Sequence, residues 1–179
     1  MPRQAQTLSN SRVEMATHST LAFFNRQRTR KLDVALLRQI TVSALADLPR
    51  VSQWDLTFYF VGAKRMAEVN ETHLHHQGPT DVITFDYNDT SAPGRLTGEI
   101  FICPDIAILQ AREFHTTWQS EVVRYLVHAL LHLCGYDDLK PGARRTLKVV
   151  ENRLVRKLGR QFNLAALGVV QKVVVAHAD

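Results

Sequence analysis

The stretch "HALLHLCGYDD", residues His128–Asp138, decides how the rest of the chain is interpreted. It closes an apolar run, "EVVRYLVHALLHLC", whose spacing predicts a helix that ends at Gly135. His128 and His132 are four residues apart, so on a helix they share one face, offset by about 40°. The glycine lets the chain turn back and bring one of the two following aspartates towards them. Two histidines and a carboxylate with an open position form a set typical of hydrolytic metal sites.

Other interpretations of this histidine pair stay open on the residues alone. Histidines at this spacing on an apolar helix also occur as hydrogen-bonded residues without a metal. One metal class is excluded, because Ala129 stands where metalloproteases with an H-E-x-x-H motif carry their glutamate base. Cys134 lies about 200° further round the helix than His132, so we expect a buried structural thiol rather than a ligand.

Composition limits the class of protein. The 179 residues suit one domain with tails, and 45% hydrophobic residues suffice for a core. The net charge of +5 favours an anionic partner, nucleic acid before membrane. No stretch of the length needed to span a bilayer is continuously apolar. Two cysteines are too few for a disulfide framework, so a reducing cytoplasm is the simplest location.

The pattern of apolar residues predicts an α+β fold. Short strands are expected near residues 21–25, 54–62, 82–85 and 96–103, and helices near 33–48, 63–74, 105–115, 121–134 and 142–159. Ser120 is the expected N-cap of the histidine helix. We therefore predict a single domain in which a small mixed four-stranded sheet packs with about five helices. Residues 1–18 are expected to be a flexible extension, 19–160 the domain, and 161–179 an extension that is packed or flexible.

With these motifs in place, the sequence resembles the YbeY family of single-strand-directed endoribonucleases, which act in ribosomal RNA maturation. Its hallmark H-G-x-L-H-L-x-G-Y-D-H corresponds to "HALLHLCGYDD", and its P-T-D-V-L-S-F segment to "PTDVITF", Pro79–Phe85. The family's N-x-x-x-R segment resembles "NETHL" from Asn70, and its G-D-I strand resembles "GEI", Gly98–Ile100. The resemblance extends from about Leu21 to Leu158.

The chain departs from the family pattern at three positions. Asp138 stands where the family has its third zinc-binding histidine. Carboxylate is a competent zinc ligand, and it makes harder ions such as manganese more competitive. Ala129 replaces a glycine, which concerns helix packing. Leu74 replaces the arginine of N-x-x-x-R, and with it a charge that could contact phosphate.

The resemblance implies a metal-dependent endoribonuclease domain with one zinc ion, or manganese, held by His128, His132 and Asp138. Glu121, seven residues before His128, is a candidate for orienting a ligand or shuttling protons; it also suits the first turn of a helix. Candidates for RNA contacts are Lys64, Arg65, His73, His75 and His76, with Arg112, Arg124, Arg144 and Arg145 on the basic surface. Asp81 is expected to cap a turn.

The implied partners are single-stranded small-subunit ribosomal RNA, the small ribosomal subunit with one of its proteins, and an assembly GTPase, without a membrane. One alternative is a non-catalytic ribosome-assembly factor that keeps the fold and the metal. Another is a metallohydrolase that acts on a small phosphoester.

Overall fold

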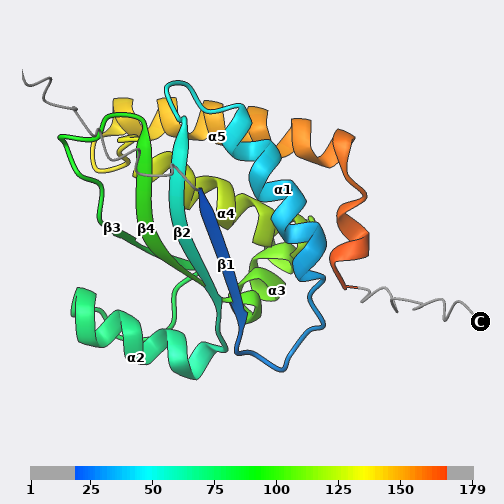
Figure 1. Ribbon diagram of the computed structural model, residues 1–179. Helices are drawn as coiled ribbons and strands as arrows, with labels where there is room; N and C mark the ends of the chain where they lie inside the picture. The colour runs from blue at the N-terminus through cyan, green and yellow to red at the C-terminus, as the bar shows by residue number, and fades with distance from the viewer. Residues whose placement is uncertain (1–18, 169–179) are drawn as a thin grey trace, which may run out of the picture.

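A mixed sheet of four strands organises residues 19–168, the part of the chain that the computed structural model describes. The strands are β1 (Thr20–Asn25), β2 (Gln53–Phe60), β3 (Val82–Asp86) and β4 (Arg95–Ile102), in the order β1-β2-β4-β3 (Figure 1). β1, β2 and β4 are parallel, and β3 runs antiparallel to β4 at the edge of the sheet. The predicted mixed sheet of four strands is confirmed.

Within residues 19–168, five α-helices and one 3₁₀ turn accompany the sheet. They are α1 (Val34–Ala46), α2 (Ala63–Leu74), α3 (Pro104–Glu113), α4 (Trp118–Leu133), α5 (Pro141–Gln161) and η1 (Leu164–Gly168). The α+β class is therefore also confirmed. Of the two predicted extensions, residues 1–18 and 169–179 lie outside the described residues. Leu167 of η1 is buried, and its carbonyl accepts a hydrogen bond from the backbone N–H of Asp33.

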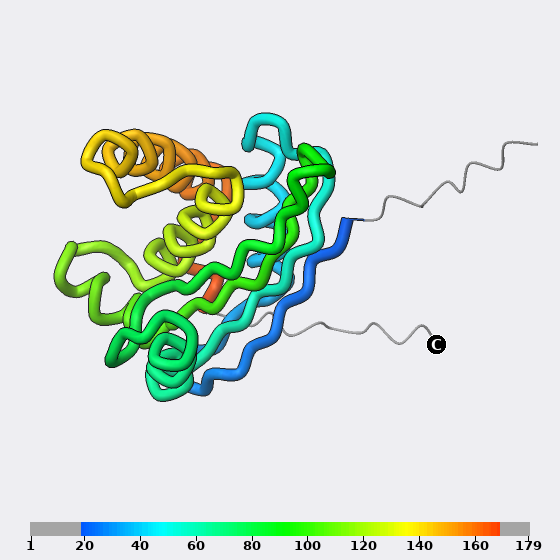
Figure 2. The backbone as a smooth tube through the Cα atoms, turned by 90° about the vertical axis from the view of Figure 1, so that its left-hand side faces the viewer, coloured from blue at the N-terminus to red at the C-terminus, as the bar shows by residue number. Residues whose placement is uncertain are grey.

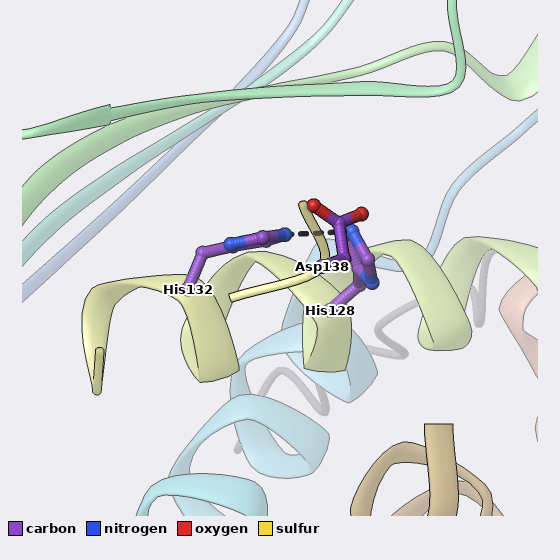
Figure 3. Close-up of side chains that lie close together, drawn as sticks. All are labelled: His128, His132 and Asp138. Carbon is purple, nitrogen blue, oxygen red and sulfur yellow. Dashed lines mark hydrogen bonds between the residues drawn. The ribbon is translucent and has the colours of Figure 1, made fainter. Parts of the chain in front are cut away.

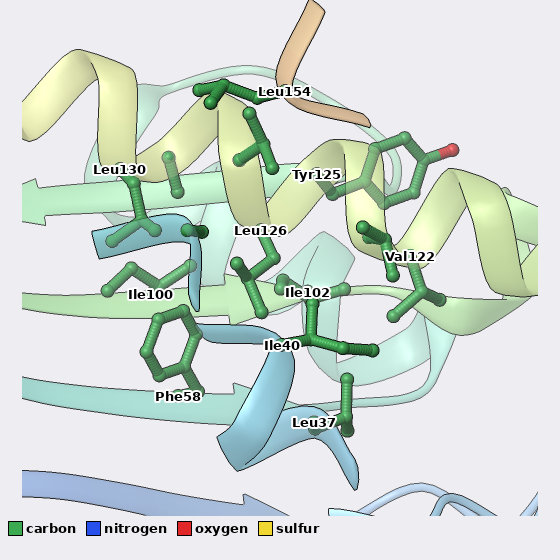
Figure 4. Packing of buried hydrophobic residues seen from close by; sticks show 14 of the residues in the cluster. Leu37, Ile40, Phe58, Ile100, Ile102, Val122, Tyr125, Leu126, Leu130 and Leu154 are labelled. Atoms are coloured by element: carbon green, nitrogen blue, oxygen red, sulfur yellow. The ribbon is translucent and has the colours of Figure 1, made fainter. Parts of the chain in front are cut away.

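The core lies between one face of the sheet and the helices α1, α4 and α5. Alternate residues of β2 and β4 point to this face, among them Phe58 and Ile100, because side chains alternate along a strand. α4 supplies Leu126 and Leu130 from its apolar stripe, as Figure 4 shows. α5 packs on the outer side of α4 (Figure 2). α4 thus lies between the sheet and α5, which explains why its sequence is apolar on most sides.

The opposite face of the sheet carries a row of aromatic rings. Phe24 stacks on Tyr59 with centroids 5.3 Å apart, and Tyr59 stacks on Phe101 at 4.7 Å. Phe85 continues the row with its edge towards Phe101. Contacts between neighbouring rings connect all four strands on this face and stabilise the sheet. α2 covers one end of this face with Met66 and neighbouring apolar residues.

The two ends of α4 are set by local hydrogen bonds. Its N-cap is Thr117, whose side chain accepts from the backbone N–H of Ser120, so the expectation that Ser120 caps the helix was wrong. The helix therefore begins one turn earlier than predicted, with Trp118. At its other end Gly135 adopts a positive φ of 84°, as its predicted role requires. The backbone N–H of Tyr136 then reaches back to the Leu131 carbonyl, which closes the helix and reverses the chain.

None of the helices in residues 19–168 is both long and apolar enough to cross a bilayer. The longest of them, α5, carries basic residues along its exposed side.

Gly98 in β4 occupies a position without room for a side chain. A Cβ there would lie 2.7 Å from the backbone oxygen of Phe85 and 3.0 Å from a methyl group of Leu133. We therefore expect Gly98→Ala to lower the free energy of unfolding by about 1–3 kcal/mol, measured by urea denaturation. Gly142→Ala is the matched control: nothing lies within 4 Å of its Cβ position, and alanine favours the helix. An equal loss of stability in both variants would contradict this interpretation.

Candidate metal centre

His128 and His132 project from the same side of α4 towards the turn that follows the helix (Figure 3). Their Nε2 atoms are 3.0 Å apart. A zinc ion about 2.0–2.1 Å from each of two nitrogens in tetrahedral geometry separates them by roughly 3.3 Å. The predicted pairing of the two imidazoles is thus present, and their geometry suits one small ion bound by both.

Asp138 completes a cluster in which one donor atom from each of the three side chains lies within 4.8 Å of the others. The turn at Gly135 brings this aspartate back over the helix, as Figure 3 shows. Asp137 is engaged elsewhere, because its carboxylate accepts the backbone N–H of Leu139. The guanidinium of Arg144 donates to the backbone oxygen of Asp138 and holds this part of the loop. Of the two adjacent aspartates, Asp138 alone belongs to the cluster.

Glu151 of α5 lies behind His128. Its carboxylate is 3.0 Å from Nδ1 of His128, and the residue is only 2% exposed. Burial raises the pKa of this carboxyl, but hydrogen bonds from His128, Arg124 and Lys148 outweigh it and lower the pKa to about 2. The ionised carboxylate keeps a hydrogen on Nδ1 of His128, which leaves Nε2 as the ligand atom. Metal-binding histidines commonly have such a carboxylate partner.

The surroundings of His132 favour its neutral, metal-binding form. Burial and, next, the neighbouring His128 lower the pKa of His132, while Asp138 acts in the opposite direction. A lowered pKa keeps the imidazole unprotonated at neutral pH, and only the unprotonated ring can bind a metal. The chemistry of all three donors therefore fits a divalent transition metal.

Glu121, a candidate from the sequence, is also buried but has different partners. Its carboxylate accepts a hydrogen bond from the Thr116 hydroxyl and pairs with Arg124 at 3.3 Å. Neither histidine is among its hydrogen-bonding partners within residues 19–168. Arg124 links it to Glu151, with which the guanidinium makes a contact of 2.6 Å. Glu121 thus reaches His128 only through Arg124 and Glu151.

Sequence reasoning missed Glu151, although the sequence contains a signal for it. The residue occupies a position in the apolar stripe of α5, between Leu147 and Leu154, both buried. A carboxylate at such a position needs partners, because an unpaired buried charge is costly. That pattern could have marked Glu151 as part of a polar site, but not as the partner of His128.

The cluster lies between two hollows in the surface. One, of about 380 Å³, lies towards α5 and is lined by Gln110, Tyr125, Arg124, Arg144 and Lys148 among others. The second, of about 710 Å³, lies towards strand β3 and is lined by Leu74, His76, Val82, Thr84 and Leu139 among others. His128, Asp138 and Asp81 line both hollows. Asp81 also accepts the backbone N–H of Val82, in agreement with its predicted capping role.

The structure separates the five predicted RNA contacts. His76 and the neighbouring Leu74 line the hollow beside β3, close to the cluster. His73 places its ring against the ring of Phe85, with centroids 5.1 Å apart, and His75 forms the left-handed end of α2. Lys64 and Arg65 are exposed at the opposite end of the same helix, where Arg65 pairs with Glu68. Only the C-terminal end of α2 therefore adjoins the cluster.

The four arginines predicted on the basic surface lie in different surroundings. Arg124 is largely enclosed by its two glutamate partners, so it belongs to the buried network. Arg144 lines the hollow towards α5, and Arg145 is exposed on that helix. Arg112 lines a separate hollow at the end of α3.

The fold and the cluster define the class: a single α+β domain with a candidate mononuclear metal site of two histidines and one carboxylate. The family model described as "Endoribonuclease YbeY" matches residues 22–159. The chain belongs to this family.

Individual relatives agree with this assignment. The chain is 35% identical to endoribonuclease YbeY of Parabacteroides distasonis over 112 residues, which cover 63% of this chain and 77% of the relative. It is 34% identical to that of Chlorobium luteolum, with coverage of 73% and 93%, and 27% identical to that of Aquifex aeolicus, with coverage of 84% and 98%. The solution structure of TM1509 from Thermotoga maritima has the same fold, with a TM-score of 0.57 and 22% identity, and covers 88% of this chain and 100% of its own.

Proposed function

We propose that the protein is a metal-dependent endoribonuclease that cuts single-stranded RNA. The observation that carries this proposal is the cluster of His128, His132 and Asp138 between two surface hollows, one of which contains basic side chains. A phosphodiester lying across both hollows would pass directly over the three donor atoms. The relatives named as endoribonucleases support the same activity.

The residues around the cluster have distinct roles in this proposal. Glu151 holds the ring of His128 in the orientation that presents Nε2. Arg144 and Lys148 attract the phosphate of the strand to be cut, and the carbonyl contact of Arg144 keeps Asp138 in place. A bound ion supplies Lewis-acid chemistry, lowering the pKa of a water and polarising a phosphoryl oxygen. We propose that Glu121 acts indirectly, by fixing Arg124 against Glu151.

The hollow beside β3 suits an unpaired strand. Two backbone hydrogen bonds flank β3: the N–H of Cys103 donates to the C=O of Asp81, and the N–H of Tyr87 donates to the C=O of Thr97. In this antiparallel register, the odd-numbered residues of β3 are therefore the ones whose backbone groups bond to β4. The N–H and C=O of Thr84 therefore point away from the sheet, into the region of the second hollow. They can contact the sugar–phosphate backbone of a single strand. His76, with His73 and His75 nearby, can contact the sugar–phosphate backbone at the end of α2. Leu74, at the same end, has no charge to take the place of the family's arginine. Lys64 and Arg65 would meet only a longer RNA.

We propose one zinc ion per chain as the cofactor, with manganese a competent substitute because of the carboxylate ligand. The proposed setting is the maturation of small-subunit ribosomal RNA and ribosome quality control in the cytoplasm. The proposed partners are the small ribosomal subunit, one of its proteins and an assembly GTPase. The support for this setting is the family to which the chain belongs.

The decisive experiment is a cleavage assay with labelled RNA in the presence of zinc, manganese or magnesium. Single-stranded RNA should be cut at internal positions, and the same sequence within a duplex should resist. Binding of RNA without cleavage in any of the three metals would favour the non-catalytic assembly factor. Absence of RNA binding by metal-loaded protein at low salt would contradict both functions.

The two adjacent aspartates allow a sharp test of the ligand set. Asp138→Ala should weaken metal affinity by at least tenfold, because it removes a donor, whereas Asp137→Ala removes only a turn contact and should change the affinity little. Asp138→His should retain the metal, since imidazole is an equally good zinc ligand. Metal titration of the three variants measures the difference. A greater loss in Asp137→Ala than in Asp138→Ala would overturn the assignment.

A further inference from the structure

Helix α5 accounts for the whole net positive charge of the protein. Its 21 residues include seven arginines and lysines and a single acidic residue, Glu151, which gives the helix a net charge of +6. The entire chain has a net charge of +5, so the rest of the sequence has a net charge of −1. The basic character of the protein is therefore a property of one surface element.

The charges of α5 are divided between its two sides. Glu151 is buried against α4, whereas all seven basic residues are exposed. Three of the seven have partners: Lys148 pairs with Glu151, Lys157 pairs with Asp47, and Arg144 donates to a backbone carbonyl. The remaining four, Arg145, Arg153, Arg156 and Arg160, form no ion pair within the described residues. We refer to these four as the arginine face.

The arginine face is a strip along one side of α5, interrupted by the exposed Val149 between Arg145 and Arg153. At about 100° per residue, its four members lie within roughly 80° of one another, and at 1.5 Å per residue they extend over about 22 Å. Arg153, Arg156 and Arg160 line a shallow hollow of about 650 Å³ together with Lys157 and Gln161. The strip lies on roughly the opposite side of α5 from Glu151, and thus away from the metal cluster. Because α5 lies outside α4, this side faces solvent (Figure 2).

We propose that the arginine face binds the phosphate backbone of the RNA substrate, outside the cleavage site. This inference rests on the proposed function and adds a second contact region to it. Arginine suits the role because its planar guanidinium donates paired hydrogen bonds to phosphate. The strip also begins close to the cleavage site, since Arg145 follows Arg144, which lines the hollow at the cluster. An RNA longer than the cleaved segment can therefore continue from the cluster around the N-terminal end of α5.

A membrane surface fits this helix less well. Helices that lie on lipid insert an apolar face between the head groups. The apolar side of α5, formed by Leu147, Leu154 and Leu158, is already buried in the core of the protein. On its exposed side α5 carries seven basic residues and a single large hydrophobic side chain, Val149, so charge dominates what it offers to a partner, as in a contact with nucleic-acid backbone.

The test compares two triple variants with equal changes in charge. In the first, Arg153, Arg156 and Arg160 are replaced by glutamine, which keeps helix propensity. In the control, Arg28, Arg30 and Lys31 are replaced by glutamine; these exposed residues lie between β1 and α1, at the end of the sheet remote from α5 (Figure 1). Circular dichroism and thermal unfolding verify that both variants fold. Each is assayed with a single-stranded hexanucleotide and with a single-stranded RNA of about 30 nucleotides.

The α5 variant should bind the long RNA at least tenfold more weakly at low salt. Because each lost phosphate contact removes about 0.7 from the slope of log affinity against log salt, the slope should become shallower by about 2. Cleavage of the hexanucleotide should be unchanged, whereas kcat/KM for the long RNA should fall at least tenfold. The control variant should resemble the wild-type protein in all of these measurements.

Three outcomes would overturn the inference. The first is an α5 variant that binds the long RNA with wild-type affinity and salt dependence. The second is an equal loss in the control, which would show that net charge acts without regard to its location. The third is loss of binding to vesicles of equal parts phosphatidylglycerol and phosphatidylcholine while RNA binding is unchanged, which would identify a lipid surface. If the wild-type protein binds RNA through α5 but cuts no RNA, the proposed function fails and this inference stands.

Discussion

Replacing His128 and His132 together by alanine should remove the bound metal and lower RNA cleavage by at least a thousandfold, roughly 4 kcal/mol in activation free energy. The reason is that the pair supplies two of the three donor atoms of the cluster. The protein should still fold, because both imidazoles are only partly buried and Glu151 keeps Arg124 and Lys148 as partners. Elemental analysis of the purified protein and a single-turnover cleavage assay measure the two effects.

The control removes two imidazoles elsewhere. His73 and His76 lie at the end of α2, outside the cluster, so their double alanine variant should retain one ion per chain even if RNA binding weakens. A His128/His132 double variant with a full metal content would show that the ion is held by other residues. Unchanged cleavage in a metal-free double variant would contradict metal-dependent chemistry.

The second large effect is expected at Glu151. Glu151→Gln should weaken metal affinity by about 10- to 100-fold, because the amide no longer fixes the hydrogen on Nδ1 of His128. Glu121→Gln is a closely matched control. Both glutamates are 2% exposed and both pair with Arg124, but only Glu151 contacts a histidine. We expect the Glu121 variant to keep its metal affinity within about twofold, as determined by competition with a chelator.

Comparing these two variants separates positioning of the ligand from general loss of a buried charge. If both weaken metal binding equally, the effect arises from the disturbed Arg124 and not from the orientation of His128. If Glu121→Gln lowers cleavage without changing metal affinity, the sequence-based expectation of a catalytic role for Glu121 gains support. A Glu151 variant with unchanged affinity would remove this carboxylate from the site.

The features predicted from the sequence are those determined by neighbouring residues. The spacing of His128 and His132, the stop at Gly135 and the alternation of strand residues each depend on a local period, and each is found in the structure. The choice of Asp138 over Asp137 came from the family resemblance, and the turn that engages Asp137 gives it a physical reason. Local patterns are informative because a helix or strand repeats its geometry every few residues.

The features that the sequence did not predict depend on contacts between distant elements. Glu151 reaches His128 from another helix, 23 residues further along the chain. The enclosure of Arg124 by two glutamates, and the separation of Lys64 from the cluster, follow from how the helices pack. No periodicity encodes which helices become neighbours. The basic residues of α5 can be counted in the sequence, but only the structure shows which side of the helix is buried and which is exposed.

The order of the strands has a consequence for how the molecule acquires its activity during synthesis. Only β3 and β4 pair through a short connection, whereas β1 and β2 must each find a parallel partner across a long intervening segment. Such non-local pairings slow folding, because chain entropy is lost before the contacts form. The histidines of α4 and the carboxylate of α5 follow all four strands that lie within residues 19–168. All four described strands are therefore synthesised before the side chains of the candidate metal centre, and this centre cannot assemble until both α4 and α5 have been made.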